Sequence, residues 1–357
     1  MKAGVARSIA RSWLDAERER AIRAGESVDG AFFTGSINAL SDQDDFPATS
    51  DVDLCVILSS PTPSPRRIVK REFRGLVIEP FYLPRENFPS AQAALADFSL
   101  ACHLVAPSAL YDPLGLLGSL RAAMADRYAR REWILARCAQ ARDHCLALMS
   151  RAYGSGSLCF VNAILTHAIQ GMAQMLLLAD LGVPTVKQAL VRAAELLERL
   201  GMPEPQGRLL RLLGAEGLGA DRRAADRKAE AMAADCAAAL REAVRVFETP
   251  FPADNAISEH TLPSIESEAM RCIAEGRARE ISLWIAHLHS LSLHVIGDDS
   301  DAPSKRYFEE AYAADMATLG MGTIEASRRR LAEIRSHFDE IMRVCEAIAS
   351  IREKKES

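Results

Sequence analysis

The spacing of apolar residues changes at about residue 116 and divides the chain into two parts. Before this point, short apolar runs alternate with turns, which is typical of strands and short helices. After it, apolar residues recur with the period of an α-helix almost to the end of the chain. A chain of 357 residues is long enough for two domains with separate cores. We therefore expect an α+β protein, with a small mixed-sheet domain over residues 1–115 and a large all-helical domain over residues 116–357.

The first part predicts a helix over residues 5–25, with Val5, Ile9, Trp13 and Leu14 on its apolar face. A second helix is expected near 90–98, and strands are expected at 28–34, 51–58, 76–83 and 100–106. The second part predicts helices at 118–152, 157–181, 185–200, 221–248, 264–296, 305–318 and 322–351. Residues 162–181 are nearly all apolar and suit a central helix, whereas residues 202–220, rich in Pro and Gly, suggest a connection.

Asp51 and Asp53 lie at the start of an apolar run that predicts a β-strand. Side chains alternate along a strand, so these two carboxylates project from the same face. Two adjacent acids on a largely buried strand repel each other and are costly to desolvate. A divalent cation relieves both problems, and oxygen ligands suit Mg²⁺. Two solvated acids at the start of a strand are the alternative.

Gly35 and Ser36 follow the strand expected at 28–34, and helix-compatible residues come after them. A strand that ends in Gly-Ser at a helix start offers backbone N–H groups and a hydroxyl suited to holding phosphate. Gly-Ser by itself is an ordinary turn. Its meaning comes from the order strand, Gly-Ser, short helix or loop, and then Asp-x-Asp at the start of the next strand.

This order, Gly35-Ser36 followed by Ser50-Asp51-Val52-Asp53-Leu54, resembles the nucleotidyltransferase superfamily that includes DNA polymerase β and the aminoglycoside nucleotidyltransferases. The resemblance covers roughly the first 115 residues. Residues 37–50 form a longer polar segment than members usually have, and we interpret it as an enlarged loop.

The resemblance implies a third carboxylate on the next strand, and Glu79 in the apolar run 76–83 is the candidate. Glu79 would serve as a metal ligand or as the base that deprotonates the acceptor hydroxyl. If its strand pairs antiparallel with that of Asp51, Glu79 can face the same site. The alternative is an acid at a sheet edge beside Pro80.

The activity implied is Mg²⁺-dependent transfer of a nucleoside monophosphate from a nucleoside triphosphate to a hydroxyl of a small-molecule acceptor. Two Mg²⁺ ions are expected on Asp51, Asp53 and Glu79, with ATP as the expected triphosphate. Gly35 and Ser36 would position its β- and γ-phosphates, and the helical domain would supply the acceptor pocket. The alternative is an antitoxin-like or regulatory protein of the same fold that modifies or binds a protein partner.

Other polar clusters have plainer interpretations. The basic residues of the run 66–74 either line a triphosphate entrance or form a solvated face; they are Arg66, Arg67, Lys70, Arg71 and Arg74. Asp112 suits a turn or helix cap, with a substrate contact as the alternative, and residues 154–157 (Gly-Ser-Gly-Ser) suit a turn between helices. His287, His289 and His294 lack the spacing of a zinc site, so we interpret them as hydrogen-bonded core or groove residues.

Composition narrows the class of protein. The net charge of −5 does not favour a nucleic-acid partner, because nucleic-acid binding draws on clustered Lys and Arg. Eight cysteines without metal-type spacing suggest reduced thiols and a cytoplasmic protein. We see no apolar run that approaches membrane-spanning length and no signal-peptide core, so no membrane partner is expected.

Overall fold

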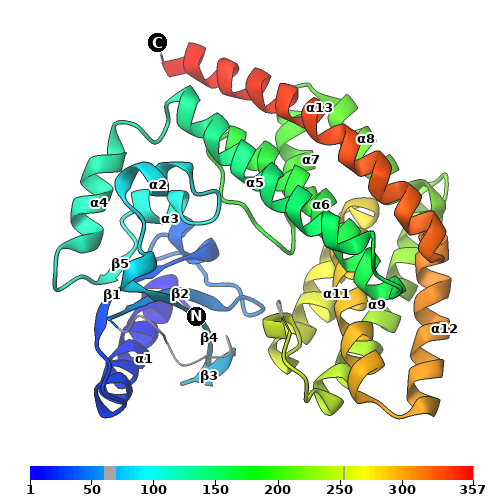
Figure 1. The fold of residues 1–357 in the computed structure, drawn as a ribbon, viewed down its shortest axis with the longest axis horizontal. Coiled ribbons are helices and arrows are strands. Elements are labelled where there is room, and N and C mark those ends of the chain that lie inside the picture. The colour runs from blue at the N-terminus through cyan, green and yellow to red at the C-terminus, as the bar shows by residue number, and fades with distance from the viewer. Residues whose placement is uncertain (60–69, 252–253, 357) are drawn as a thin grey trace. The chain divides into compact units, whose positions relative to one another are not determined.

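The computed structural model of the chain describes residues 1–59, 70–251 and 254–356. These residues form two compact units, Met1–Arg137 and Cys138–Ser357, and the division falls inside helix α5 (Arg131–Ala152) (Figure 1). The first unit holds a mixed sheet and its covering helices, and the described part of the second is helical. The predicted α+β class is therefore confirmed. The first unit extends past residue 115, because α4 (Leu116–Ala125) packs on the sheet.

The strands found in the described part of the chain form one five-stranded sheet with the order β3-β4-β2-β1-β5. The β1–β2, β1–β5 and β3–β4 pairs are antiparallel, and the β2–β4 pair is parallel. Their bounds are β1 Val28–Phe33, β2 Val52–Leu58, β3 Arg71–Phe73, β4 Leu76–Pro84 and β5 Ala109–Tyr111.

The antiparallel pairing considered for the strands of Asp51 and Glu79 is not found, because β2 and β4 run parallel. The short strand β3 precedes β4 and forms the antiparallel hairpin with it, turning at Arg74 and Gly75, both of which have positive φ. The chain therefore reverses direction between β3 and β4, and β4 runs beside β2 in the same direction as β2. Alternating apolar residues are compatible with either direction, so the pattern of 76–83 did not distinguish them.

Helices cover both faces of the sheet. On one face, α1 (Ala3–Arg23) packs with Trp13 and Leu14 against strand residues such as Leu54. Val5, expected on this face, is 51% exposed, and the small residues Ala3, Ala6 and Ala10 are fully buried in its place. The other face carries α2 (Ala91–Ala96), α3 (Ala101–Val105) and α4.

The strand predicted at 100–106 is wrong, because these residues form the short helix α3. Asp97 explains the difference: its Oδ1 atom accepts hydrogen bonds from the backbone N–H groups of Ser99 and Leu100, both at 2.8 Å. An Asp that binds backbone N–H groups ahead of it favours a helix start. The strand that completes the sheet, β5, follows a few residues later.

The second unit is built around α6 (Leu158–Ala179), which packs against α11 (Ala278–Asp299) and α13 (Ile324–Glu356). The prediction of a central helix over 162–181 is confirmed by the burial of α6. The statement that no apolar run has membrane-spanning length is wrong, because α6 is long and apolar enough to cross a membrane. In the structure, 94% of its apolar window is buried inside the protein.

The remaining helices of this unit are α7 Ala189–Arg199, α8 Pro203–Leu213, α9 Arg222–Val246, α10 Met270–Ala274 and α12 Ala302–Thr318. Three predicted segments differ. The connection expected at 202–220 contains α8, because its prolines occupy the first helical turn, where proline is tolerated. The helix expected at 118–152 is interrupted between α4 and α5. The helix expected at 264–296 is interrupted at Gly276, which has a φ of +86°.

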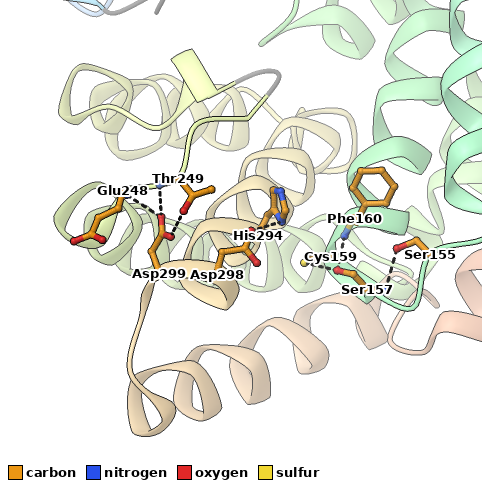
Figure 2. Close-up of polar contacts among 9 residues, drawn as sticks. All are labelled: Ser155, Ser157, Cys159, Phe160, Glu248, Thr249, His294, Asp298 and Asp299. Atoms are coloured by element: carbon orange, nitrogen blue, oxygen red, sulfur yellow. Dashed lines mark hydrogen bonds and ion pairs between the residues drawn. The ribbon is translucent and has the colours of Figure 1, made fainter.

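Local polar contacts lie at the start of α6 and near the end of α11 (Figure 2). Ser157 caps α6, because its Oγ accepts a hydrogen bond from the Phe160 N–H at 3.3 Å, as expected for the Gly-Ser turn at 154–157. Near the end of α11, the Asp299 carboxylate accepts hydrogen bonds from the N–H groups of Glu248 and Thr249 and from the Thr249 hydroxyl.

Candidate functional site

Asp51, Asp53 and Glu79 form a compact group that we call the acid cluster. Each residue offers one carboxylate oxygen, and these three oxygens all lie within 4.8 Å of one another. All three residues are partly buried. No other group of three or more His, Cys, Asp or Glu residues in the described part of the chain has this geometry.

The alternation of β2 and β4 builds the acid cluster. Asp53 and Glu79 are register partners on these two parallel strands, and Val52 pairs with Ile78 just before them. Val52 and Ile78 are fully buried, so their side chains take one face and the two acids take the other. Asp51 immediately precedes β2 and brings the third carboxylate to the same place.

Gly35 lies directly against the acid cluster. A Cβ atom on this residue would come 1.9 Å from Asp53 Oδ2 and 2.9 Å from Asp53 Cγ. Its φ of +68° lies in the left-handed region, which favours glycine. The absence of a side chain therefore serves two purposes here, since it permits the turn and it leaves room for the Asp53 carboxylate. The Gly-Ser turn and the acid pair, separated by the 37–50 segment, are neighbours in space.

Backbone and side-chain contacts hold this turn in place. The Thr34 N–H donates a 2.9 Å hydrogen bond to the Asp53 carbonyl oxygen. Gly35 begins the short 3₁₀ helix η1 (Gly35–Ala39), in which Asn38 Nδ2 donates to the Phe33 carbonyl oxygen at 2.8 Å and lies 3.3 Å from His103 Nδ1. The Ser36 side chain is exposed at the same turn.

Lys70 enters the acid cluster from the segment before β3. Its ammonium group contacts Asp51 Oδ2 and lies 3.2 Å from Glu79 Oε2. The residue is only 6% exposed. Burial alone would lower the pKa of Lys70, but the charges of Asp51 and Glu79 outweigh burial and raise that pKa above its ordinary value. Lys70 is therefore a buried, charged cation held by two members of the acid cluster.

Sequence reasoning missed the position of Lys70, because it treated the basic run 66–74 as one unit. Arg66 and Arg67 lie outside the described residues, whereas Arg71 and Arg74 are exposed, as the solvated-face interpretation expected. Lys70 differs because it is followed by the strand that pairs with the Glu79 strand. The strand that follows Lys70 has only three residues, so no local signal in the sequence separates Lys70 from the rest of the run.

The other expected polar residues have structural roles. Asp112 caps α4, since its carboxylate accepts hydrogen bonds from the N–H groups of Leu117 at 3.1 Å and Gly118 at 2.8 Å. His287 and His289 are buried, as expected of core residues, with His287 Nδ1 3.0 Å from Thr166 Oγ1. His294 is partly exposed and lies 3.7 Å from the Asp298 carboxylate (Figure 2).

The acid cluster fits a hard divalent cation in its chemistry. It offers oxygen atoms alone, from three carboxylates gathered at one point, and these are the ligands that Mg²⁺ prefers. The buried Lys70 ammonium shows that a positive charge is stabilised among these oxygens. No protein-family model matches the chain, and no curated protein is significantly similar to it in sequence.

Proposed function

We propose that the chain is a Mg²⁺-dependent nucleotidyltransferase that transfers a nucleoside monophosphate from a nucleoside triphosphate, with ATP as the first choice, to a hydroxyl of a small-molecule acceptor. One observation carries this proposal: the three carboxylates of the acid cluster converge directly beside the Gly35 turn. A cation site and a turn with free backbone N–H groups at one point suit a bound triphosphate and its metal. The resemblance of both motifs to the nucleotidyltransferase superfamily supports the same conclusion.

In this proposal, Asp51, Asp53 and Glu79 would hold the divalent cations. The cations, when bound, neutralise negative charge on the phosphate oxygens. The reaction forms a bond between the acceptor oxygen and the α-phosphorus and breaks the bond from that phosphorus to the bridging oxygen, so that pyrophosphate leaves. The proton of the acceptor hydroxyl must go to a base, and Glu79 is the candidate if it does not serve as a ligand.

The Gly35 turn would orient the triphosphate. Its backbone is fixed to β2 through the Thr34 hydrogen bond to Asp53 and to β1 through the Asn38 side chain. A rigid turn holds its N–H groups ready for the β- and γ-phosphates and loses little entropy when they bind. The exposed Ser36 hydroxyl is free to add a hydrogen bond.

A second candidate function is a protein of the same fold that binds or modifies a protein partner, as in antitoxin-like regulators. Lys70 is the observation that favours it. Because the ammonium of Lys70 already balances part of the charge of Asp51 and Glu79, the acid cluster can persist without a metal and without catalysis.

Label transfer tests the proposal and separates the two candidates. The protein is incubated with Mg²⁺ and each of the four nucleoside triphosphates labelled at the α-phosphate, against a panel of hydroxylated small molecules and against cell extract. Label on a small molecule supports the first candidate, and label on a macromolecule alone supports the second as a modifying enzyme. The control is the Asp51→Asn, Asp53→Asn double variant, which should transfer no label.

Absence of label from every acceptor, together with nucleotide affinity that is the same in the wild type and in the double variant, would overturn the enzymatic proposal. The control matters because it separates nucleotide binding that depends on the acid cluster from binding elsewhere on the protein.

A further inference from the structure

Lys70 occupies the position in which the acid cluster needs a positive charge. Its side chain is buried, and its ammonium contacts both Asp51 and Glu79. A buried lysine is tolerated only where charges of opposite sign compensate for its lost hydration. The same holds for the carboxylates, so Lys70 and the acid cluster stabilise each other.

The oxygens that hold Lys70 belong to residues that a divalent cation would use. Mg²⁺ binds carboxylate oxygens at roughly 2.0–2.1 Å. A cation bound to Asp51 and Glu79 at such a distance would lie within a few ångströms of the Lys70 ammonium. Like charges this close, in a poorly hydrated place, repel each other strongly. The ammonium and the metal therefore oppose each other at the acid cluster.

We propose that Lys70 is a displaceable counter-ion of the acid cluster, which balances part of the negative charge of the cluster when no divalent cation is bound and competes with that cation for Asp51 and Glu79. This inference rests on the proposed function, because it takes the acid cluster to be a divalent-cation site. It assigns to Lys70 a role in metal affinity that neither the motif nor the basic run indicated.

The local structure allows Lys70 to leave. The pairing of β3 with β4 begins at Arg71 opposite Ile78, so Lys70 lies outside the strand ladder. Lysine carries its ammonium on a flexible four-carbon stem, which can turn away without a change in the main chain. Displacement then breaks two ion pairs and no ladder hydrogen bond. The resting protein should bind metal more weakly than the three carboxylates alone would.

Mn²⁺ binding without nucleotide tests this inference. The free Mn²⁺ concentration is followed by electron paramagnetic resonance in titrations of the wild type, of Lys70→Met and of the control Arg71→Met. Methionine keeps the length and apolar stem of lysine without its charge, whereas Arg71 is an exposed cation one residue away. We expect Lys70→Met to lower the Kd for Mn²⁺ at least tenfold and Arg71→Met to leave it within twofold.

Thermal unfolding gives a second measurement that needs no turnover. Lys70→Met should melt below the wild type in the presence of a chelator, and Mn²⁺ should raise its Tm by more than it raises that of the wild type. Should Lys70→Met fail to fold without metal, Lys70→Gln retains a hydrogen-bond donor and removes the charge, and the same tighter binding is expected of it.

The outcomes separate the inference from the proposed function. Measurable Mn²⁺ binding by the wild type that is unchanged or weaker in both Lys70 variants would overturn the inference and leave the proposed metal site standing. No Mn²⁺ binding by the wild type or by any variant would overturn the proposed function, and the inference with it.

Discussion

Asp53 and Glu79 lie directly opposite each other on the parallel strands β2 and β4. Neighbouring strands are about 4.8 Å apart, so partner residues place their side chains side by side on one face. Two carboxylates in this position, with Asp51 next to them, repel each other unless a cation lies between them. The register of these strands is thus the structural reason to expect a cation at this end of the sheet.

Asp53→Asn should remove most of the metal affinity and the transfer activity without unfolding the protein. Asparagine has the shape of aspartate but lacks its charge, so we expect Mn²⁺ affinity to fall at least tenfold and label transfer by on the order of 100-fold or more. Mn²⁺ titration and the label assay measure both, and circular dichroism checks the fold. The matched control is Glu72→Gln, an exposed acid on β3, which should change neither. Full activity in Asp53→Asn would show that the metal assignment is wrong.

Gly35→Ala should also weaken metal binding at the acid cluster, because the new side chain would displace Asp53. The new Cβ would lie 1.9 Å from Asp53 Oδ2 and 3.2 Å from Asp53 Cβ, so rotation of the carboxylate alone cannot relieve the contact. We expect Mn²⁺ affinity to fall on the order of tenfold as Asp53 is pushed aside.

Gly75→Ala is the control for Gly35→Ala. Gly75 has a similar φ of +75°, but its Cβ would meet nothing within 4 Å. Both variants carry the strain of a left-handed alanine, roughly 1–2 kcal/mol, and only Gly35→Ala has the steric conflict. Equal loss of metal affinity in the two variants would attribute the effect to strain and contradict the assigned role of Gly35.

The sequence predicted the elements of the site but not how they are joined. The period of two along β2 placed Asp51 and Asp53 on one face, and the apolar run around Glu79 predicted its strand. These features depend only on local alternation. The parallel pairing of β2 with β4 depends on the hairpin made by β3, a strand of three residues with no strong pattern of its own.

The burial of Lys70 is another feature that the local sequence did not predict. A lysine in a basic run is usually solvated, and only the tertiary approach of Asp51 and Glu79 makes its burial favourable.

In the helical unit, the prolines and glycines near α8 were interpreted as breakers, although Pro203 starts that helix and Gly214, with a φ of +80°, ends it. Breaker residues mark helix ends as well as connections.

His103 should titrate far below an ordinary histidine. Burial lowers its pKa from 6.5 to about 4, and its Nδ1 faces the Asn38 amide. The native state thus prefers the neutral imidazole, so the contribution of His103 to stability is complete above pH 6.5 and is lost as the pH falls toward 4. The loss is of the order of 3 kcal/mol.

Histidine NMR signals measured against pH check this expectation. The imidazole signals that disappear in His103→Gln should keep their neutral-form shifts down to about pH 5 in the wild type. Glutamine can still accept the Asn38 hydrogen bond, so the turn should remain intact in this variant. The control is His337→Gln on α13, which should leave the His103 signals unchanged. A His103 midpoint near 6.5 would mean that the residue is solvated in solution.

Gly171→Ala tests how closely α5 and α6 pack in the helical unit. A Cβ on Gly171 would lie 2.2 Å from the Sγ atom of Cys145, which is 2% exposed. Alanine in place of glycine favours a helix by about 1 kcal/mol, but overpacking a core costs roughly 1–3 kcal/mol. We therefore expect a net loss of up to about 2 kcal/mol in the free energy of unfolding, measured by urea denaturation followed by circular dichroism.

Cys145→Ala in the same chain should reverse this loss. It removes the Sγ atom that the new methyl group would meet, so the double variant should be more stable than the sum of the single effects predicts, by about 1 kcal/mol or more. Strictly additive effects would mean that the two helices move apart to accept the methyl group. In that case Gly171 would not be the residue that sets their separation.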